Sequence, residues 1–170
     1  MAASKTEEWI CQMRDRHLEA ARPLHSEERS ALDSYCDAWL LDAVRVKVVP
    51  EIERPPFYHA LRGQLAFVGM RFDFDFAGVD GLTFDRCVLI RRSPVTPDLL
   101  FHELVHVEQY RQLGVSRFAT AYLRGFAEND FVYEEIPLEK IAFTLTGRFQ
   151  TNERFLVREE IASWLAARGY

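Results

Sequence analysis

The chain has 170 residues, of which 48% are hydrophobic and 28% are charged. This length and balance are typical of one globular domain, and they exclude a disordered chain, a collagen-like repeat and a disulfide-stapled miniprotein. The net charge of −5, from 26 acidic and 21 basic residues, leaves no basic stripe for a phosphate backbone. We therefore expect a single domain over residues 1–170 and no nucleic-acid partner.

The cysteines and the first residues of the chain bear on location. Cys11, Cys36 and Cys87 are odd in number, widely spaced and set among apolar neighbours, which indicates buried free thiols in a reducing compartment. The first ten residues lack the apolar core of a secretory signal. No run approaches the 18 apolar residues that a transmembrane helix needs. These features predict a cytoplasmic protein with no membrane partner.

Residues 1–60 are predicted to be mainly helical. Apolar residues at three- and four-residue spacing favour a helix over residues 6–21, and Ser26 with the two glutamates after it begins a second helix that reaches about residue 40. Valines alternate with basic residues between 44 and 48, which predicts a short strand that ends at Pro50. A proline-rich loop follows.

The middle of the chain is predicted to be rich in strands and the rest to be helical. Strands are expected over 65–68, 72–76 and 82–92, with hairpin turns at Gly78 and Asp80-Gly81. Thr96-Pro97-Asp98 is a strong helix start, and Gly114 can end that helix. Further helices are expected over 116–128, 137–149 and 152–168. The result is an α+β fold in which several helices flank a small sheet of three or four mostly antiparallel strands.

One pentapeptide carries recognisable chemistry: His102-Glu103-Leu104-Val105-His106. Two histidines four residues apart lie on one face of a helix, so both rings can reach a single ion. Glu103 points about 100° around the helix from His102, and that direction suits a general base acting on water better than a metal ligand. The alternative is a helix with two partly buried histidines and no metal.

A catalytic zinc usually has three protein ligands, so a third must come from another element. No histidine follows His106, which leaves the downstream carboxylates as candidates: Glu128, Asp130, Glu134, Glu135 and Glu139. Glu139 is favoured because Pro137 begins a helix around it and Ala142, on the same face, is small enough for close helix packing. Glu135 and Glu134 are the alternatives, and a solvated acid at a helix start is the explanation without a metal.

These segments resemble a known family. Residues 96–110, Thr-Pro-Asp-Leu-Leu-Phe-His-Glu-Leu-Val-His-Val-Glu-Gln-Tyr, and residues 133–142 are similar to the small gluzincin-type zinc metallopeptidases, or minigluzincins. The resemblance covers roughly residues 65–150 and leaves residues 1–60 as a helical extension. It implies a zincin-like fold, one zinc ion bound by His102, His106 and Glu139, and Glu103 as the general base.

The resemblance also implies how a substrate would bind. The strand before the histidine helix, here residues 87–91, would pair along its edge with an extended peptide. Tyr133 and His59 are the candidates for the oxyanion donor that such a reaction needs. The leading hypothesis is a zinc metallopeptidase that acts on a peptide or protein substrate. The alternatives are a zinc-binding module without turnover and an acidic interaction protein with an accidental motif.

Overall fold

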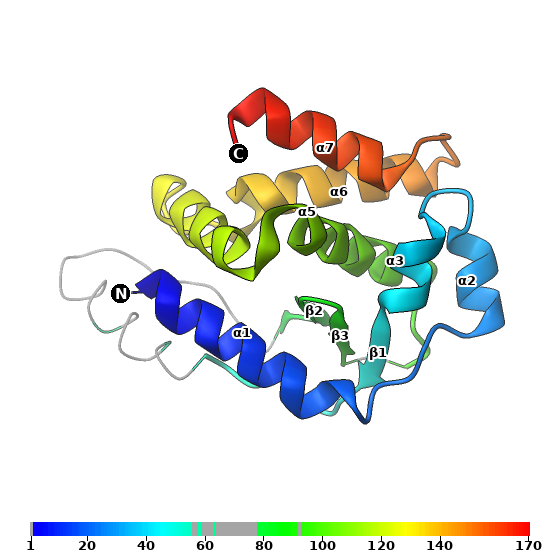
Figure 1. The fold of residues 1–170 in the computed structure, drawn as a ribbon, viewed down its shortest axis with the longest axis horizontal. Helices are drawn as coiled ribbons and strands as arrows, with labels where there is room; N and C mark the ends of the chain where they lie inside the picture. Colours follow the sequence, from blue (N-terminus) through cyan, green and yellow to red (C-terminus); the bar gives the residue numbers. More distant parts are fainter. Residues whose placement is uncertain (1, 56–57, 59–62, 64–77, 92) are drawn as a thin grey trace.

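The computed structural model describes residues 2–55, 58, 63, 78–91 and 93–170 (Figure 1). Its elements are α1 (Ala2–Leu18), α2 (Ser26–Leu32), α3 (Ala38–Ala43), β1 (Arg45–Val48), β2 (Gly81–Phe84), β3 (Cys87–Ile90), α5 (Pro97–Glu128), the 3-10 helix η2 (Tyr133–Glu135), α6 (Pro137–Gln150) and α7 (Val157–Arg168). The α+β fold class is confirmed, because a small sheet packs against helices. The strands expected over 65–68 and 72–76 lie outside the described residues.

The described strands form a mixed sheet in the order β1-β3-β2. β3 pairs in parallel with β1, where Val46 lies opposite Val88, and antiparallel with β2, where Thr83 lies opposite Val88. The sequence predicted mostly antiparallel pairing, whereas one of these two pairings is parallel. Parallel neighbours require a long connection, and residues 49–86 separate β1 from β3. The alternation of side chains within one strand does not indicate whether its neighbour runs parallel or antiparallel to it.

Residues 82–92 do not form the single strand that was expected. β2 and β3 are the two arms of a hairpin, and Asp85 and Arg86 make the turn between them. Asp85 has a positive φ of 59°, a conformation that aspartate tolerates better than most residues. The hairpin expected across Gly78 and Asp80-Gly81 has its first arm at residues 72–76, outside the described residues, and stays a prediction, although Gly81 itself belongs to β2.

The predicted helices are present with changed boundaries. The segment predicted as one helix from Ser26 to about residue 40 splits into α2 and α3, because Asp37 accepts a hydrogen bond from the backbone N–H of Leu40 (2.9 Å) and so caps a new helix. α7 begins at Val157, five residues later than expected. α5 joins two predicted helices across a kink at Gly114, whose φ of 73° and ψ of 159° are not helical.

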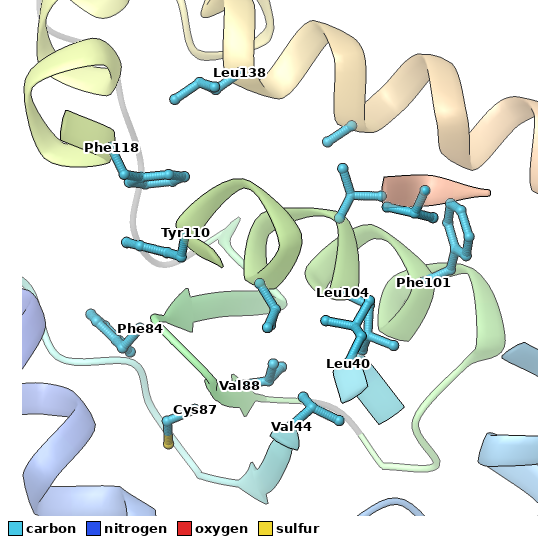
Figure 2. Close-up of a cluster of buried hydrophobic side chains, with 14 of the residues drawn as sticks. Leu40, Val44, Phe84, Cys87, Val88, Phe101, Leu104, Tyr110, Phe118 and Leu138 are labelled. Atoms are coloured by element: carbon cyan, nitrogen blue, oxygen red, sulfur yellow. The ribbon is translucent and has the colours of Figure 1, made fainter. Parts of the chain in front are cut away.

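α5 lies between α6 and the sheet (Figure 1), and one cluster of buried apolar side chains connects the three. Leu104 of α5 and Val88 of β3 lie in this cluster on the side of the sheet (Figure 2). Phe101 stacks on Phe149 of α6 with ring centroids 4.4 Å apart. Because both sides of α5 are covered, every residue from Leu100 to Tyr110 is buried. The histidine pentapeptide therefore lies in the interior of the molecule.

Two further observations concern the thiols and the helices. Cys36 and Cys87 are buried, Cys11 is partly exposed, and all three are free thiols. Burial raises the pKa of Cys36 to about 12 and that of Cys87 to about 11. Among the described helices, none combines the length and the apolar character needed to cross a bilayer.

Candidate metal centre

Three side chains meet between α5 and α6. His102 and His106 lie one turn apart on α5, and Glu139 lies in the first turn of α6. The Nε2 atoms of the two histidines are 3.1 Å apart, and each lies 3.3 Å from Oε2 of Glu139. All three residues are buried. The expected proximity of Glu139 to the histidine pair is confirmed.

The spacing of these three atoms fits a metal ion. A tetrahedral ion bound at about 2.0–2.1 Å holds its ligand atoms about 3.3–3.4 Å apart. The observed separations of 3.1 and 3.3 Å come close to one face of that tetrahedron. Two imidazoles and one carboxylate are also a donor set found at catalytic zinc centres. The group can therefore hold a metal ion.

The charges in the group favour a cation at the same place. Burial alone would lower the pKa of His106, but the Glu139 carboxylate raises it to about 9. Burial alone would raise the pKa of Glu139, but His106 and His102 hold it far below its ordinary value. Glu139 is therefore ionised at neutral pH, which is the state that binds a metal. A proton or a metal ion between these side chains satisfies the same electrostatic demand.

Small residues allow α6 to approach the histidines closely. A Cβ added to Gly125 would lie 2.6 Å from Cδ of Pro137, so only glycine leaves room for the start of α6. Ala142, one turn after Glu139, is fully buried. The side-chain amide of Gln109 donates to the carbonyl of Leu138 (2.9 Å) and ties α5 to the first turn of α6. The distance between the ligands from the two helices is set by these contacts.

The second ring nitrogen of each histidine has a partner. Nδ1 of His106 lies 2.9 Å from Oε1 of Gln109, and because the amide nitrogen of Gln109 already donates elsewhere, Oε1 accepts from Nδ1. Nδ1 of His102 lies 3.5 Å from Oγ1 of Thr146, whose hydroxyl donates to the carbonyl of Ala142 (2.8 Å). These partners place the ring protons on Nδ1. Both Nε2 atoms are then available to a metal.

Glu139 is held by tyrosine. The Tyr122 hydroxyl donates to Oε1 of Glu139 at 2.8 Å, while Oε2 faces the histidines. Burial raises the pKa of Tyr122 well above its usual value, so the hydroxyl keeps its proton. One oxygen is thus fixed by a hydrogen bond and the other is directed at the metal position. Such contacts fix the orientation of metal ligands in other proteins.

Glu103 faces β2 instead of the three ligands. Its Oε2 accepts a hydrogen bond from the Thr83 hydroxyl at 2.7 Å. A Cβ added to Gly81 would lie 2.5 Å from its Oε1, so the carboxylate occupies space that only glycine leaves open. Burial raises the pKa of Glu103, and the nearby His106 and His102 offset part of that rise. Glu103 lies beside the metal position, in the direction that its place on the helix predicts.

An open cleft reaches this group from the surface. His102, Glu103, Tyr133 and Phe143 lie in its wall, and none of the described lining residues is lysine or arginine. Phe143 is 45% exposed, and its ring centroid is 4.7 Å from that of His102. Burial raises the pKa of Tyr133 well above its usual value, so its phenol is a proton donor at neutral pH. His59, the other oxyanion candidate, lies outside the described residues.

None of the other candidate carboxylates, all of which lie in the described part of the chain, belongs to the ligand group. Glu128 pairs with Arg124 at 2.7 Å on the exposed side of α5, and Glu135 pairs with Lys140. Asp130 and Glu134 lie in the wall of the cleft. Among the described residues, the only group of three possible ligands is His102, His106 and Glu139. The helix start at Pro137 is what separates Glu139 from the alternatives.

The expected peptide-binding edge at residues 87–91 was wrong. β3 has β1 on one side and β2 on the other, so its backbone groups are already paired within the sheet and cannot pair with a substrate. The error follows from treating residues 82–92 as one strand. The hairpin instead places β2 against Glu103.

Sequence reasoning did not identify the residues that position Glu103 and the three ligands: Gly81, Thr83, Gln109, Tyr122 and Thr146. Two of them had a signal. Gln109 follows His106 by three residues and Thr146 follows Glu139 by seven, and both spacings place side chains on one helical face. The contacts of Thr83 and Tyr122 cross between elements and had no local signal.

Comparisons of the chain with protein-family models, with curated proteins and with solved structures found no match. The interpretation of this centre therefore depends on the geometry of the chain itself. That geometry is a buried group of two histidines from α5 and one glutamate from α6. It is consistent with the HExxH…E arrangement of a gluzincin-like site.

Proposed function

We propose that the protein is a zinc-dependent metallopeptidase with one zinc ion per chain. His102, His106 and Glu139 are the proposed ligands, and Glu103 is the proposed general base. The observation that carries the proposal is the set of three buried ligand atoms, 3.1 to 3.3 Å apart, with a buried carboxylate next to them. The open cleft at His102 and Glu103 supports access for a substrate.

A bound zinc ion supplies a Lewis acid that polarises a carbonyl and lowers the pKa of water. Glu103 takes the proton of the attacking water and returns it to the leaving amine. Its burial supports this role, because a raised pKa makes the carboxylate a stronger base. The Thr83 hydroxyl holds Oε2, which leaves Oε1 for the water. The proton that Glu103 takes from the water thus ends on the leaving amine.

Tyr133 is the proposed donor to the oxygen that becomes negative during the reaction. Its hydroxyl stays protonated at neutral pH, since burial raises its pKa well above the usual value. It lines the same cleft as Glu103. A donor placed before the reaction stabilises the developing charge without reorganisation.

The proposed substrate is a peptide or protein, and the proposed location is the cytoplasm. The three free thiols support a reducing compartment. A metal-binding module without turnover has the same ligands, and only an assay of hydrolysis distinguishes it from an enzyme.

The test measures zinc and hydrolysis in the same preparations. We expect one zinc per chain by elemental analysis, and cleavage of a mixed peptide library detected by mass spectrometry. The Glu103→Gln variant should keep the zinc and lose cleavage by about 10²–10⁴-fold, because it removes the base and leaves the ligands in place. Zinc without cleavage by the parent protein would favour the non-catalytic module. Equal cleavage by parent and variant would show that Glu103 is not the base.

A further inference from the structure

We propose that α1 closes an apolar pocket beside the candidate metal centre, and that this pocket binds an aromatic or branched aliphatic side chain of the substrate. The identity of the ligand as a peptide rests on the proposed function. The pocket itself can be tested without any assumption about the metal or about catalysis.

The pocket adjoins the candidate metal centre. It has a volume of about 120 Å³, and Glu103, His106 and Glu139 bound one end of it. Apolar side chains from three elements form most of the remaining wall: Trp9 and Ile10 from α1, Phe84 from β2, and Phe118, Leu123 and Phe126 from α5. The cavity is therefore shared by β2, the second half of α5 and α1, and α1 is far from the other two in sequence.

The size and the chemistry of the wall define the ligand. A dry apolar cavity of roughly 150 Å³ holds one benzene molecule, so a volume of 120 Å³ suits a group of about that size. None of the described lining residues is lysine or arginine. An acidic side chain would lose its hydration in the pocket without gaining an opposite charge, and a basic one would meet carboxylates only at the end formed by Glu103 and Glu139. A phenyl ring or a branched aliphatic side chain satisfies both conditions.

Contacts between aromatic rings hold the wall in place. Trp9 meets Phe84 edge to face, with centroids 5.0 Å apart and ring planes at 84°. Phe118 stacks on Tyr110 with centroids 3.7 Å apart. Figure 2 shows Phe84, Tyr110 and Phe118 along one side of the buried cluster. The pocket therefore exists before a ligand enters, and binding requires little rearrangement of its wall.

The pocket and the open cleft meet at the candidate active site. Gly81, Glu103 and Tyr133 line both of them. A peptide whose side chain fills the pocket therefore has its backbone next to Glu103, while the rest of the chain can lie in the cleft. The pocket is placed to select the residue next to the cleaved bond. α1, which lies outside the resemblance to minigluzincins, acts as a specificity wall.

The test uses toluene as a probe, because toluene cannot ligate a metal. We expect saturation-transfer NMR to detect toluene binding to the full-length protein as purified. Ala119 lines the pocket and is fully buried, so Ala119→Leu should fill the space and weaken toluene binding at least tenfold. Ala127→Leu, which adds the same side chain at an exposed position of the same helix, is the control and should bind toluene as the parent does.

A second variant, Trp9→Ala, tests the pocket independently in case Ala119→Leu does not fold. Trp9→Ala removes the α1 wall, and we expect it to bind naphthalene, which the parent pocket is too small to hold. Toluene binding that is equal in the folded Ala119→Leu variant and the parent would overturn the proposal. Absence of toluene binding to the folded parent would overturn it as well.

The peptide library separates this inference from the proposed function. If peptides are cleaved, the parent should prefer Phe or Leu next to the cleaved bond, and Ala119→Leu should shift that preference to smaller residues. Cleavage without such a preference would overturn the pocket and leave the peptidase intact. Toluene binding with the expected variant effects, but without cleavage of any peptide, would leave the pocket intact and contradict the peptidase.

Discussion

The two halves of α5 have different roles. Before Gly114 the helix is buried on every side between Leu100 and Tyr110, and this half carries both histidines and Glu103. After Gly114 the helix is amphipathic, with buried residues on one stripe and exposed residues on the other. The first half supplies the reactive groups of the candidate centre. The second half contacts the centre from outside, with Phe118 near His106 and Tyr122 bonded to Glu139 of α6.

The kink at Gly114 makes this division possible. In a straight helix the twelve residues from His106 to Phe118 would separate their positions by about 18 Å along the axis. The ring centroids of His106 and Phe118 are 6.3 Å apart. The chain must therefore turn back at Gly114, and its backbone angles lie in a region that is essentially restricted to glycine. The break brings Phe118 of the second half back to His106 of the first half.

Breaking the first half should have the largest effect. We expect the double variant His102→Ala/His106→Ala to lose all stoichiometric zinc in elemental analysis, because Glu139 alone cannot hold the ion. The matched control is His17→Ala/His25→Ala, which removes the same number of histidines far from the centre in sequence and should keep one zinc per chain. Zinc retained by the first variant would refute the site.

Changing the second half should have a smaller effect on the same property. Tyr122→Phe removes the hydroxyl that holds Oε1 of Glu139, and loss of such a partner weakens metal binding by about 10–100-fold. Competition with a chromophoric chelator measures the change. Tyr110→Phe is the control, because it removes the same group from another buried tyrosine, whose ring stacks on Phe118. Equal zinc affinity for Tyr122→Phe and the parent would show that the second half does not support the ligands.

Changing the junction should affect stability more than chemistry. Gly114→Ala forces a side chain into the positive-φ conformation and should lower the free energy of unfolding by about 1–3 kcal/mol. Gly147→Ala is the comparison, because Gly147 is helical and an added Cβ meets nothing within 4 Å. It should be neutral or stabilise by up to about 1 kcal/mol. Urea denaturation measures both variants, and equal values would mean that the kink carries no strain for alanine.

The prediction from sequence succeeded where the signal was local and failed where it was not. Thr96 and Pro97 marked the start of α5, Pro137 marked the start of α6, and the latter favoured Glu139 over Glu135. The hairpin was missed, because its turn at Asp85 and Arg86 has no glycine and interrupts an otherwise apolar run. The central position of β3 depends on pairing with β1, which no pattern within residues 82–92 encodes.

Local patterns were enough to specify the helix that carries His102 and His106, the direction of Glu103 and the helix that begins at Pro137. Spacing along a helix determines these features within one or two turns. Only the tertiary structure decided that Thr83 bonds to Glu103 and that Tyr122 bonds to Glu139. It also decided that Trp9 lines the apolar pocket beside these two glutamates. The first two pairs are separated by 20 and 17 residues. Contacts at such separations arise when whole elements pack together, and the periodicity of one helix or strand does not predict them.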